Sequence, residues 1–204
     1  MPIFQRREQP PALKDYHYYK PYLRRDFLNR CAYCLLHEGD EAAGGFHAFT
    51  IDHFKPRKHF PLLETIYGNL YYACRWCNRA KSDTWPTDAE SGPGYRFVDP
   101  CLEDLYLKHS RTDKVTGRLE PLSKPGEYTI GNVRLNRKIF RQLRVKRFEA
   151  QANINECAEK IERLTQTSDP GARDIVEQLR EKIRLFDAKF VNPKVPYEAA
   201  DLED

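Results

Sequence analysis

The sequence has no long hydrophobic run and no secretory signal. No apolar stretch approaches the roughly 20 residues that a helix needs to cross a bilayer, so we expect a protein that neither spans nor binds a membrane. The first eleven residues, MPIFQRREQPP, lack the apolar segment that directs a chain to secretion. These two absences together predict a cytosolic protein.

The composition is that of a globular chain of ordinary size. Of the 204 residues, 40% are hydrophobic, including 12 Tyr and 11 Phe, which is enough to bury a core. Charged residues make up 31%, and the formal net charge is only +4, so bulk charge alone says little about partners.

Six cysteines in a cytosolic chain are expected to be reduced thiols. Four of them form two C-x-x-C pairs, Cys31/Cys34 and Cys74/Cys77, separated by residues 35–73. Four thiolates are a preferred tetrahedral ligand set for structural Zn²⁺, and they leave no open position for catalysis. We therefore predict a structural zinc site, with four buried free thiols, or a redox role for one pair, as the alternatives.

The segment that runs from the first cysteine pair to just beyond the second is predicted to form a compact unit of two strands and a helix. Residues 46–51 have the pattern of a short strand that ends at Asp52 and His53, and residues 66–73 read as a second strand with a turn at Gly68-Asn69. A helix is expected to open at residues 78–83, before a proline.

The ordered set C-x2-C, IDHFKP, then NLYYACRWCNRAK resembles the ββα-metal motif of the HNH endonucleases, in the subgroup braced by two cysteine knuckles. The resemblance covers roughly residues 31–83. It implies that His53 is the general base and that Asn69 is the central Asn that braces the loop and orients the base. Asn78 stands where many members have His, as a metal ligand.

The chemistry of these residue types agrees with that resemblance. Phosphodiester hydrolysis needs a nucleophilic water, a base and positive charge on the phosphate, and imidazole titrates near neutral pH. A carboxylate and an amide oxygen suit a hard cation such as Mg²⁺ or Mn²⁺, and Asp52 with Asn78 offers that pair. Lys81 follows Asn78 by one helical turn and is expected either to hold a phosphate oxygen or to be a solvated charge.

Two basic segments are candidates for contacts with nucleic acid. Lys55, Arg57 and Lys58 directly follow the predicted base. Residues 134–147 hold seven basic residues and no acidic one. Five of them are expected to form one stripe on a helix that can follow a phosphate backbone: Arg134, Arg137, Lys138, Arg141 and Arg144. The alternative is a solvated helix face or a surface for an acidic partner.

Helical periodicity marks both ends of the chain. A short helix is expected from Pro21 to about Arg30, and a helical hairpin over the C-terminal third, whose second helix starts at Asp169-Pro170. We predict an α+β fold, in which a zinc-braced ββα-metal core lies between the N-terminal helix and the C-terminal helical hairpin. The expected segments are an arm and helix over 1–30, a nuclease core over 31–90, a loop-rich connection over 91–130 and a helical region over 131–204.

The sequence thus predicts a metal-dependent endonuclease, with structural Zn²⁺, catalytic Mg²⁺ or Mn²⁺, and DNA favoured as substrate. In length and layout the chain also resembles the HNH nuclease subunits that work with an ATPase in bacterial Septu-type anti-phage defence. An RNase that cleaves transfer RNA or other RNA, and a zinc-knuckle binding module without catalysis, remain the alternatives.

Overall fold

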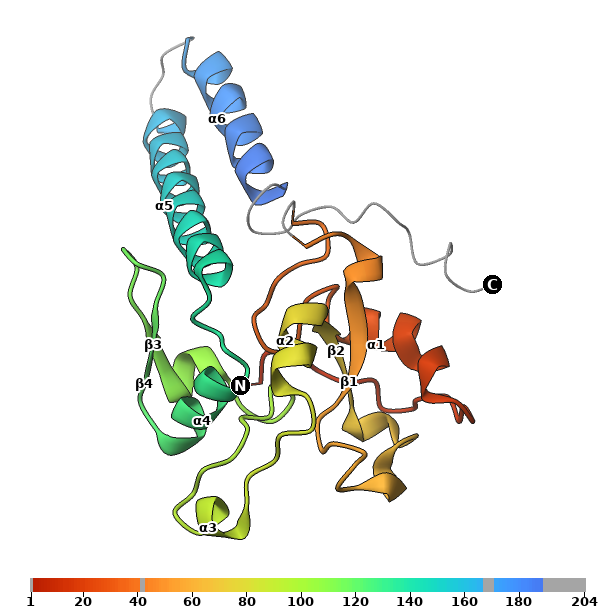
Figure 1. The fold of residues 1–204 in the computed structure, drawn as a ribbon. Coiled ribbons are helices and arrows are strands. Elements are labelled where there is room, and N and C mark those ends of the chain that lie inside the picture. Colours follow the sequence, from red (N-terminus) through yellow and green to blue (C-terminus); the bar gives the residue numbers. More distant parts are fainter. Residues whose placement is uncertain (1, 41–42, 167–170, 189–204) are drawn as a thin grey trace.

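The computed structural model describes residues 2–40, 43–166 and 171–188. The fold is α+β, as predicted, with small two-stranded sheets among helices (Figure 1). In chain order the elements are α1 (Lys20–Asp26), β1 (Phe49–His53), β2 (Leu70–Cys74), α2 (Arg75–Lys81), α3 (Asp88–Ser91), β3 (Ser110–Thr112), β4 (Leu119–Pro121), α4 (Lys124–Asn132), α5 (Lys138–Thr165) and α6 (Ala172–Phe186). No helix in the described part of the chain has both the length and the apolar character needed to span a bilayer.

The centre of the molecule is an antiparallel hairpin-like pair, β1 and β2, with α2 packed beside it (Figure 1). The register pairs Phe49 with Cys74 and His53 with Leu70. Every residue of β2 is buried, whereas in β1 only Phe49 and Asp52 are buried and the other three residues are half-buried. β2 is therefore the inner strand, which fits its LYYAC sequence of apolar and aromatic side chains.

α2 begins immediately after β2, without a loop. Cys74 is the N-cap and keeps extended backbone angles of φ −67° and ψ 150°, so the chain turns from strand to helix at a single residue. The second cysteine pair therefore spans the junction, with Cys74 at the strand end and Cys77 inside the helix. The helix starts three residues earlier than the sequence predicts, because Arg75 and Trp76 already have helical geometry.

The two strands also differ slightly from their predicted bounds. A short 3-10 helix, Phe46–Ala48, precedes β1, so Asp52 and His53 are the last two residues of the strand and do not follow it. A second 3-10 helix, Tyr67–Asn69, replaces the predicted turn and leads into β2. Register along β1 therefore decides which way Asp52 and His53 point.

The N-terminal arm and α1 cover one side of this unit. α1 has Pro21 in its first turn, as predicted, but ends at Asp26 and not near Arg30. Arg6 in the arm lies 4.4 Å over the ring of Tyr71 and donates to the carbonyls of Tyr67 and Leu70. The arm is thus held against the start of β2.

The C-terminal hairpin is confirmed: α5 and α6 pack side by side and extend away from the centre (Figure 1). The predicted helix start at Asp169-Pro170 lies outside the described residues. Near its base α5 is tied to the core, where Arg147 pairs with Asp40 at 2.9 Å and the buried Arg144 donates to the carbonyls of Gly117 and Leu135.

The predicted basic stripe is wrong as a single helical face. α4 ends at Asn132 and α5 begins at Lys138, so Arg134 and Arg137 lie in the connection. Arg134 has a φ of +54°, a left-handed conformation that breaks helical continuity. Of the five residues expected on the stripe, Lys138, Arg141 and Arg144 belong to α5, and Arg144 is buried.

Candidate functional site

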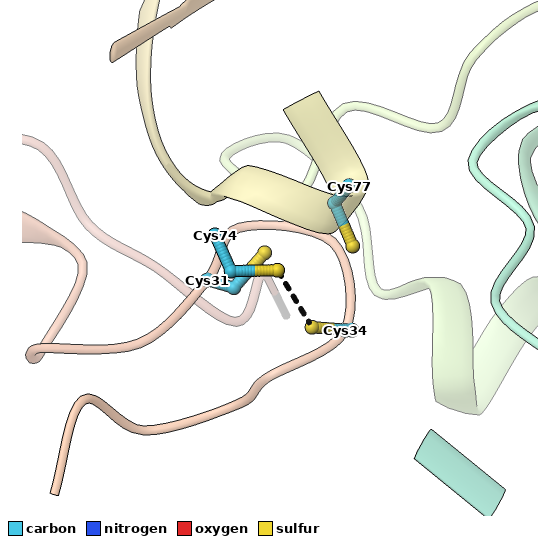
Figure 2. A group of neighbouring side chains, drawn as sticks. All are labelled: Cys31, Cys34, Cys74 and Cys77. Atoms are coloured by element: carbon cyan, nitrogen blue, oxygen red, sulfur yellow. Dashed lines mark hydrogen bonds between the residues drawn. The ribbon is translucent and has the colours of Figure 1, made fainter. Parts of the chain in front are cut away.

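The four cysteines of the two C-x-x-C motifs converge into one buried cluster (Figure 2). Their sulfur atoms all lie within 4.8 Å of one another, and the Sγ atoms of Cys34 and Cys74 are 3.7 Å apart. Sulfurs at the corners of a tetrahedron around Zn²⁺, each about 2.3 Å from the ion, would be about 3.8 Å apart. All six cysteines are free thiols, and this arrangement suggests zinc binding.

β2 holds the two cysteine pairs together, since the second pair begins at its last residue, Cys74. The backbone N–H of Ala32 in the first pair donates to the carbonyl of Tyr72 at 2.8 Å, which attaches that knuckle to the strand. Burial raises the pKa of the thiols of Cys34 and Cys77, whereas hydrogen bonds from the other three cysteines outweigh burial and lower the pKa of Cys31. A divalent cation would supply the positive charge that keeps all four sulfurs as thiolates.

A pocket of about 340 Å³ lies at the C-terminal end of β1 and beside α2. Asp52, His53 and Asn78 all contribute to its lining, with Tyr16 and Ser82 among the other lining residues. The structure therefore brings the expected base and the two expected oxygen ligands to one cavity. Their catalytic roles remain predictions.

His53 has one ring nitrogen committed to the backbone. Its Nε2 lies 2.9 Å from the carbonyl oxygen of Glu64, which can only accept, so Nε2 carries the proton and Nδ1 has the free lone pair. Burial lowers the pKa of the imidazole, partly opposed by this hydrogen bond. The half-buried ring also meets the edge of Tyr16 at a centroid distance of 4.8 Å. A neutral imidazole held at Nε2 can accept a proton at Nδ1.

Asn78 is oriented by β1. Its Nδ2 donates to Thr50 Oγ1 at 2.7 Å and to the carbonyl of Ile51 at 3.2 Å. Both amide hydrogens are thereby used, which assigns the amide orientation and turns Oδ1 away from these acceptors. An amide oxygen so directed, on a residue that lines the pocket, suits a hard cation.

Asp52 points into the protein, where it is 3% exposed. Its carboxylate accepts from the hydroxyl of Tyr33 and from Lys81 Nζ at 3.1 Å. Burial raises the pKa of this carboxyl, while Lys81 and Tyr33 oppose the shift. Each carboxylate oxygen keeps a second lone pair, so Asp52, which also lines the pocket, would be the anionic ligand of a cation bound there. The donor set of Asp52 and Asn78 thus fits Mg²⁺ or Mn²⁺.

Lys81 is placed differently from either expectation. Its side chain has no exposed surface, and Nζ binds Asp52 and, at 2.6 Å, the carbonyl oxygen of His53. It is therefore neither a solvated charge nor open to a phosphate, because α2 turns this position toward β1. Sequence spacing placed Lys81 one turn from Asn78 but did not identify its partner.

Asn69 is buried and ties down the loop that follows His53. Its Oδ1 accepts from the N–H of Lys55 at 2.8 Å, and its Nδ2 donates to the carbonyls of Lys55 and Leu63 at 3.0 and 3.2 Å. This is the geometry of a loop brace. An effect on the orientation of His53 stays a prediction.

The predicted basic residues are dispersed. Arg57 pairs with Glu64 and Lys58 with Asp83, both exposed, while Lys55 is exposed nearby. Arg137 donates to the carbonyl of Trp76 at 3.0 Å. Lys138 and Arg141 line a separate groove on α5, and Arg134 lies in another.

Three contacts at the site have no signal in the sequence. Tyr33, inside the first knuckle, reaches Asp52, and Tyr16 reaches His53 from the segment before α1. The carbonyl that fixes His53 belongs to Glu64. All three contacts are made by common residue types, and their partners are 11 or more positions away in the sequence.

The family model described as HNH endonuclease matches residues 31–84, about a quarter of the chain. The match begins at the first cysteine of the cluster and ends just beyond α2, so it contains both cysteine pairs, Asp52, His53 and Asn78. No curated protein and no solved structure matches the chain. The match supports nuclease activity in general and a nucleic acid as substrate, and it suggests metal dependence.

Proposed function

We propose that the chain is a metal-dependent endonuclease that hydrolyses phosphodiester bonds of DNA. The observation that carries the proposal is that Asp52, His53 and Asn78 line one pocket within the segment that matches the HNH family. His53 would be the general base, and Asp52 and Asn78 would hold one Mg²⁺ or Mn²⁺. The cysteine cluster would hold Zn²⁺ as a structural ion, because four thiolates leave no open coordination position.

Each residue of the site would have a separate role in the reaction. The Glu64 carbonyl holds Nε2–H of His53, so Nδ1 takes a proton from the attacking water. Asn78 presents Oδ1 because β1 holds its amide nitrogen, and Asp52 supplies the anionic ligand. When bound, the cation neutralises the phosphate and the leaving oxygen. Asn69 keeps the loop after His53 in place.

Incubation of the protein with supercoiled plasmid in Mg²⁺, Mn²⁺ or a chelator tests the activity. Nicking is expected only with added metal, and His53→Ala is expected to lower its rate by a factor of roughly 10² to 10⁴, the usual contribution of a general base. His59→Ala is the matched control, because His59 is exposed on the same loop and does not line the pocket. Zinc content and circular dichroism establish that each variant is folded.

Matched DNA and RNA substrates separate the two nuclease alternatives. Cleavage of RNA alone, such as a transfer RNA, would replace the DNA proposal with an RNase. Nucleic-acid binding without cleavage under any metal condition would indicate a zinc-knuckle binding module.

We also propose a role as the effector of an anti-phage defence complex with an ATPase, as in Septu-type systems. Its support is the layout alone, a knuckle-braced core followed by the α5 and α6 hairpin. Co-purification of the chain with an ATPase encoded beside it, lost on deletion of residues 138–204, is the expected result. An unchanged interaction after that deletion would remove the hairpin from the proposal.

A further inference from the structure

A second pocket, of about 700 Å³, adjoins the candidate catalytic pocket along α2. Its lining residues are Thr50, Arg75, Trp76, Asn78, Arg79 and Ser82. Asn78 and Ser82 also line the pocket that holds His53. The two cavities therefore meet at the expected metal ligand, and we call the second one the α2 groove.

The α2 groove is positively charged. Arg75 and Arg79 are four residues apart on α2, so they lie on the same face about 6 Å apart along the helix axis. Both side chains are exposed, and no residue that lines the groove is acidic. Within the described ranges, no carboxylate lies at ion-pair distance from either guanidinium, whereas Arg57 and Lys58 at the neighbouring pocket are both paired.

Part of this charge is held in place by packing. The guanidinium of Arg75 lies 4.9 Å over the ring of Trp76. Trp76 in turn packs its edge against Phe140 of α5, and its carbonyl accepts from Arg137. A guanidinium stacked on a fixed aromatic ring loses less side-chain entropy when it binds an anion than a free one does.

We propose that the α2 groove binds the DNA strand beside the scissile phosphate, with Arg75 and Arg79 each on a backbone phosphate. This inference rests on the proposed nuclease function, because it places the strand next to Asn78, the proposed metal ligand that lines both cavities. Contacts of this type position the substrate and carry no base specificity. The groove would thus set the register in which a phosphodiester enters the pocket of His53.

The test measures binding apart from cleavage. In the His53→Ala background, without added Mg²⁺, the dissociation constant of a fluorescent DNA duplex is measured by anisotropy at several salt concentrations. Arg75→Ala/Arg79→Ala is expected to weaken binding at least tenfold and to lower the slope of log K against log salt by roughly 1.8, since each lost phosphate contact contributes about 0.9. Arg75→Lys/Arg79→Lys keeps both charges and is expected to retain the slope.

The matched control is Arg173→Ala/Arg180→Ala on α6, which removes the same charge from exposed positions outside both pockets. Equal dissociation constants and slopes for the two alanine pairs would overturn the proposal, as would an effect on RNA of the same sequence but not on DNA. Zinc content reports whether the α2 variants keep their fold.

The outcomes separate this inference from the proposed function. If the otherwise native chain cleaves DNA but the alanine pair at Arg75 and Arg79 leaves KM and binding unchanged, the groove proposal fails and the nuclease stands. If that pair weakens DNA binding but the chain cleaves nothing, the groove stands as a DNA-binding surface, and the nuclease fails together with the placement beside a scissile phosphate. If both hold, the alanine pair raises KM with little change in kcat.

Discussion

The ammonium of Lys81 lies 3.1 Å from the carboxylate of Asp52, where Lys81 has no exposed side-chain surface and Asp52 only 3%. Burial lowers the pKa of Lys81 and raises the pKa of Asp52, and each charge opposes the shift of the other. Lys81 is therefore the internal counter-charge of the carboxylate that we propose as a metal ligand. α2 and β1 are joined at this point by an ion pair as well as by packing.

Removal of one member of this pair is expected to destabilise the protein strongly. Lys81→Met leaves a buried carboxylate without its cation, which typically costs about 3 to 5 kcal/mol in the free energy of unfolding. Lys81→Met/Asp52→Asn removes both charges, and its loss is expected to be clearly smaller than the sum of the two single losses. Urea denaturation of the four proteins completes the cycle. Additive losses would show that the two side chains do not interact in solution.

Loss of one cysteine of the cluster is expected to remove the zinc and unfold the core. Structural Zn²⁺ contributes roughly 10 kcal/mol or more to folding in small zinc domains, and the cluster joins the first knuckle to the start of α2. Cys77→Ser should therefore lower the zinc content, measured by mass spectrometry, from one ion per chain to near zero, with loss of the thermal transition. Cys157→Ser, buried outside the cluster, should keep the ion. A full zinc load on the Cys77 variant would contradict the assignment.

Asn69→Ala is expected to loosen the loop after His53. Three hydrogen bonds from the buried side chain to the part-buried backbone of Lys55 and Leu63 are lost, at a cost of about 1 to 3 kcal/mol in total. Faster amide exchange over residues 55–58 and faster tryptic cleavage after Arg57 and Lys58 are the expected readouts. Asn155→Ala, on the exposed surface of α5, is the comparison. Unchanged protection of the loop would refute the brace.

Stability is expected to fall at acidic pH through His37. Burial, and then the charges of Arg30, Arg147 and Arg24, lower its pKa to about 4, although Asp40 and Glu38 lie close by in the chain. The unfolded imidazole takes up a proton below about 6.5, whereas the folded one stays neutral until about 4. Protons therefore favour the unfolded chain in that window, and stability is lost as pH falls from 6.5 to 4. After an allowance for solvent screening the loss from this group is about 2 kcal/mol.

His37→Asn is the variant that checks this pH dependence. Asn keeps an acceptor for the N–H of Gly39, which now donates to Nδ1 of His37 at 3.0 Å, but it does not titrate. The slope of unfolding free energy against pH between 4 and 6.5 should become shallower than in the native chain. His59→Asn, at an exposed position where Nε2 meets the backbone carbonyl of Asp83, should leave the slope unchanged. Equal slopes for all three proteins would assign the acid sensitivity to other groups.

The sequence alone was sufficient for the local parts of this molecule. Two C-x-x-C pairs predicted the sulfur cluster, because each knuckle needs only its own short segment to aim two thiols at one point. Alternation predicted β1 and β2 to within a few residues, and helical periodicity predicted that the C-terminal third forms a helical hairpin. These patterns are properties of neighbouring residues, so they can be read along the chain.

Tertiary structure decided which charged side chains pair with each other inside the protein and which stay exposed for a substrate. Lys81 and Asp52 are 29 positions apart, and only the packing of α2 on β1 buries them together. The left-handed backbone at Arg134 breaks a basic stripe that spacing alone made continuous. Arg75 and Arg79 flank Cys77, and they face a groove only because that cysteine is turned inward to the cluster. The free energy of a charge depends on its partners and on its exposure, and both are set by contacts distant in sequence.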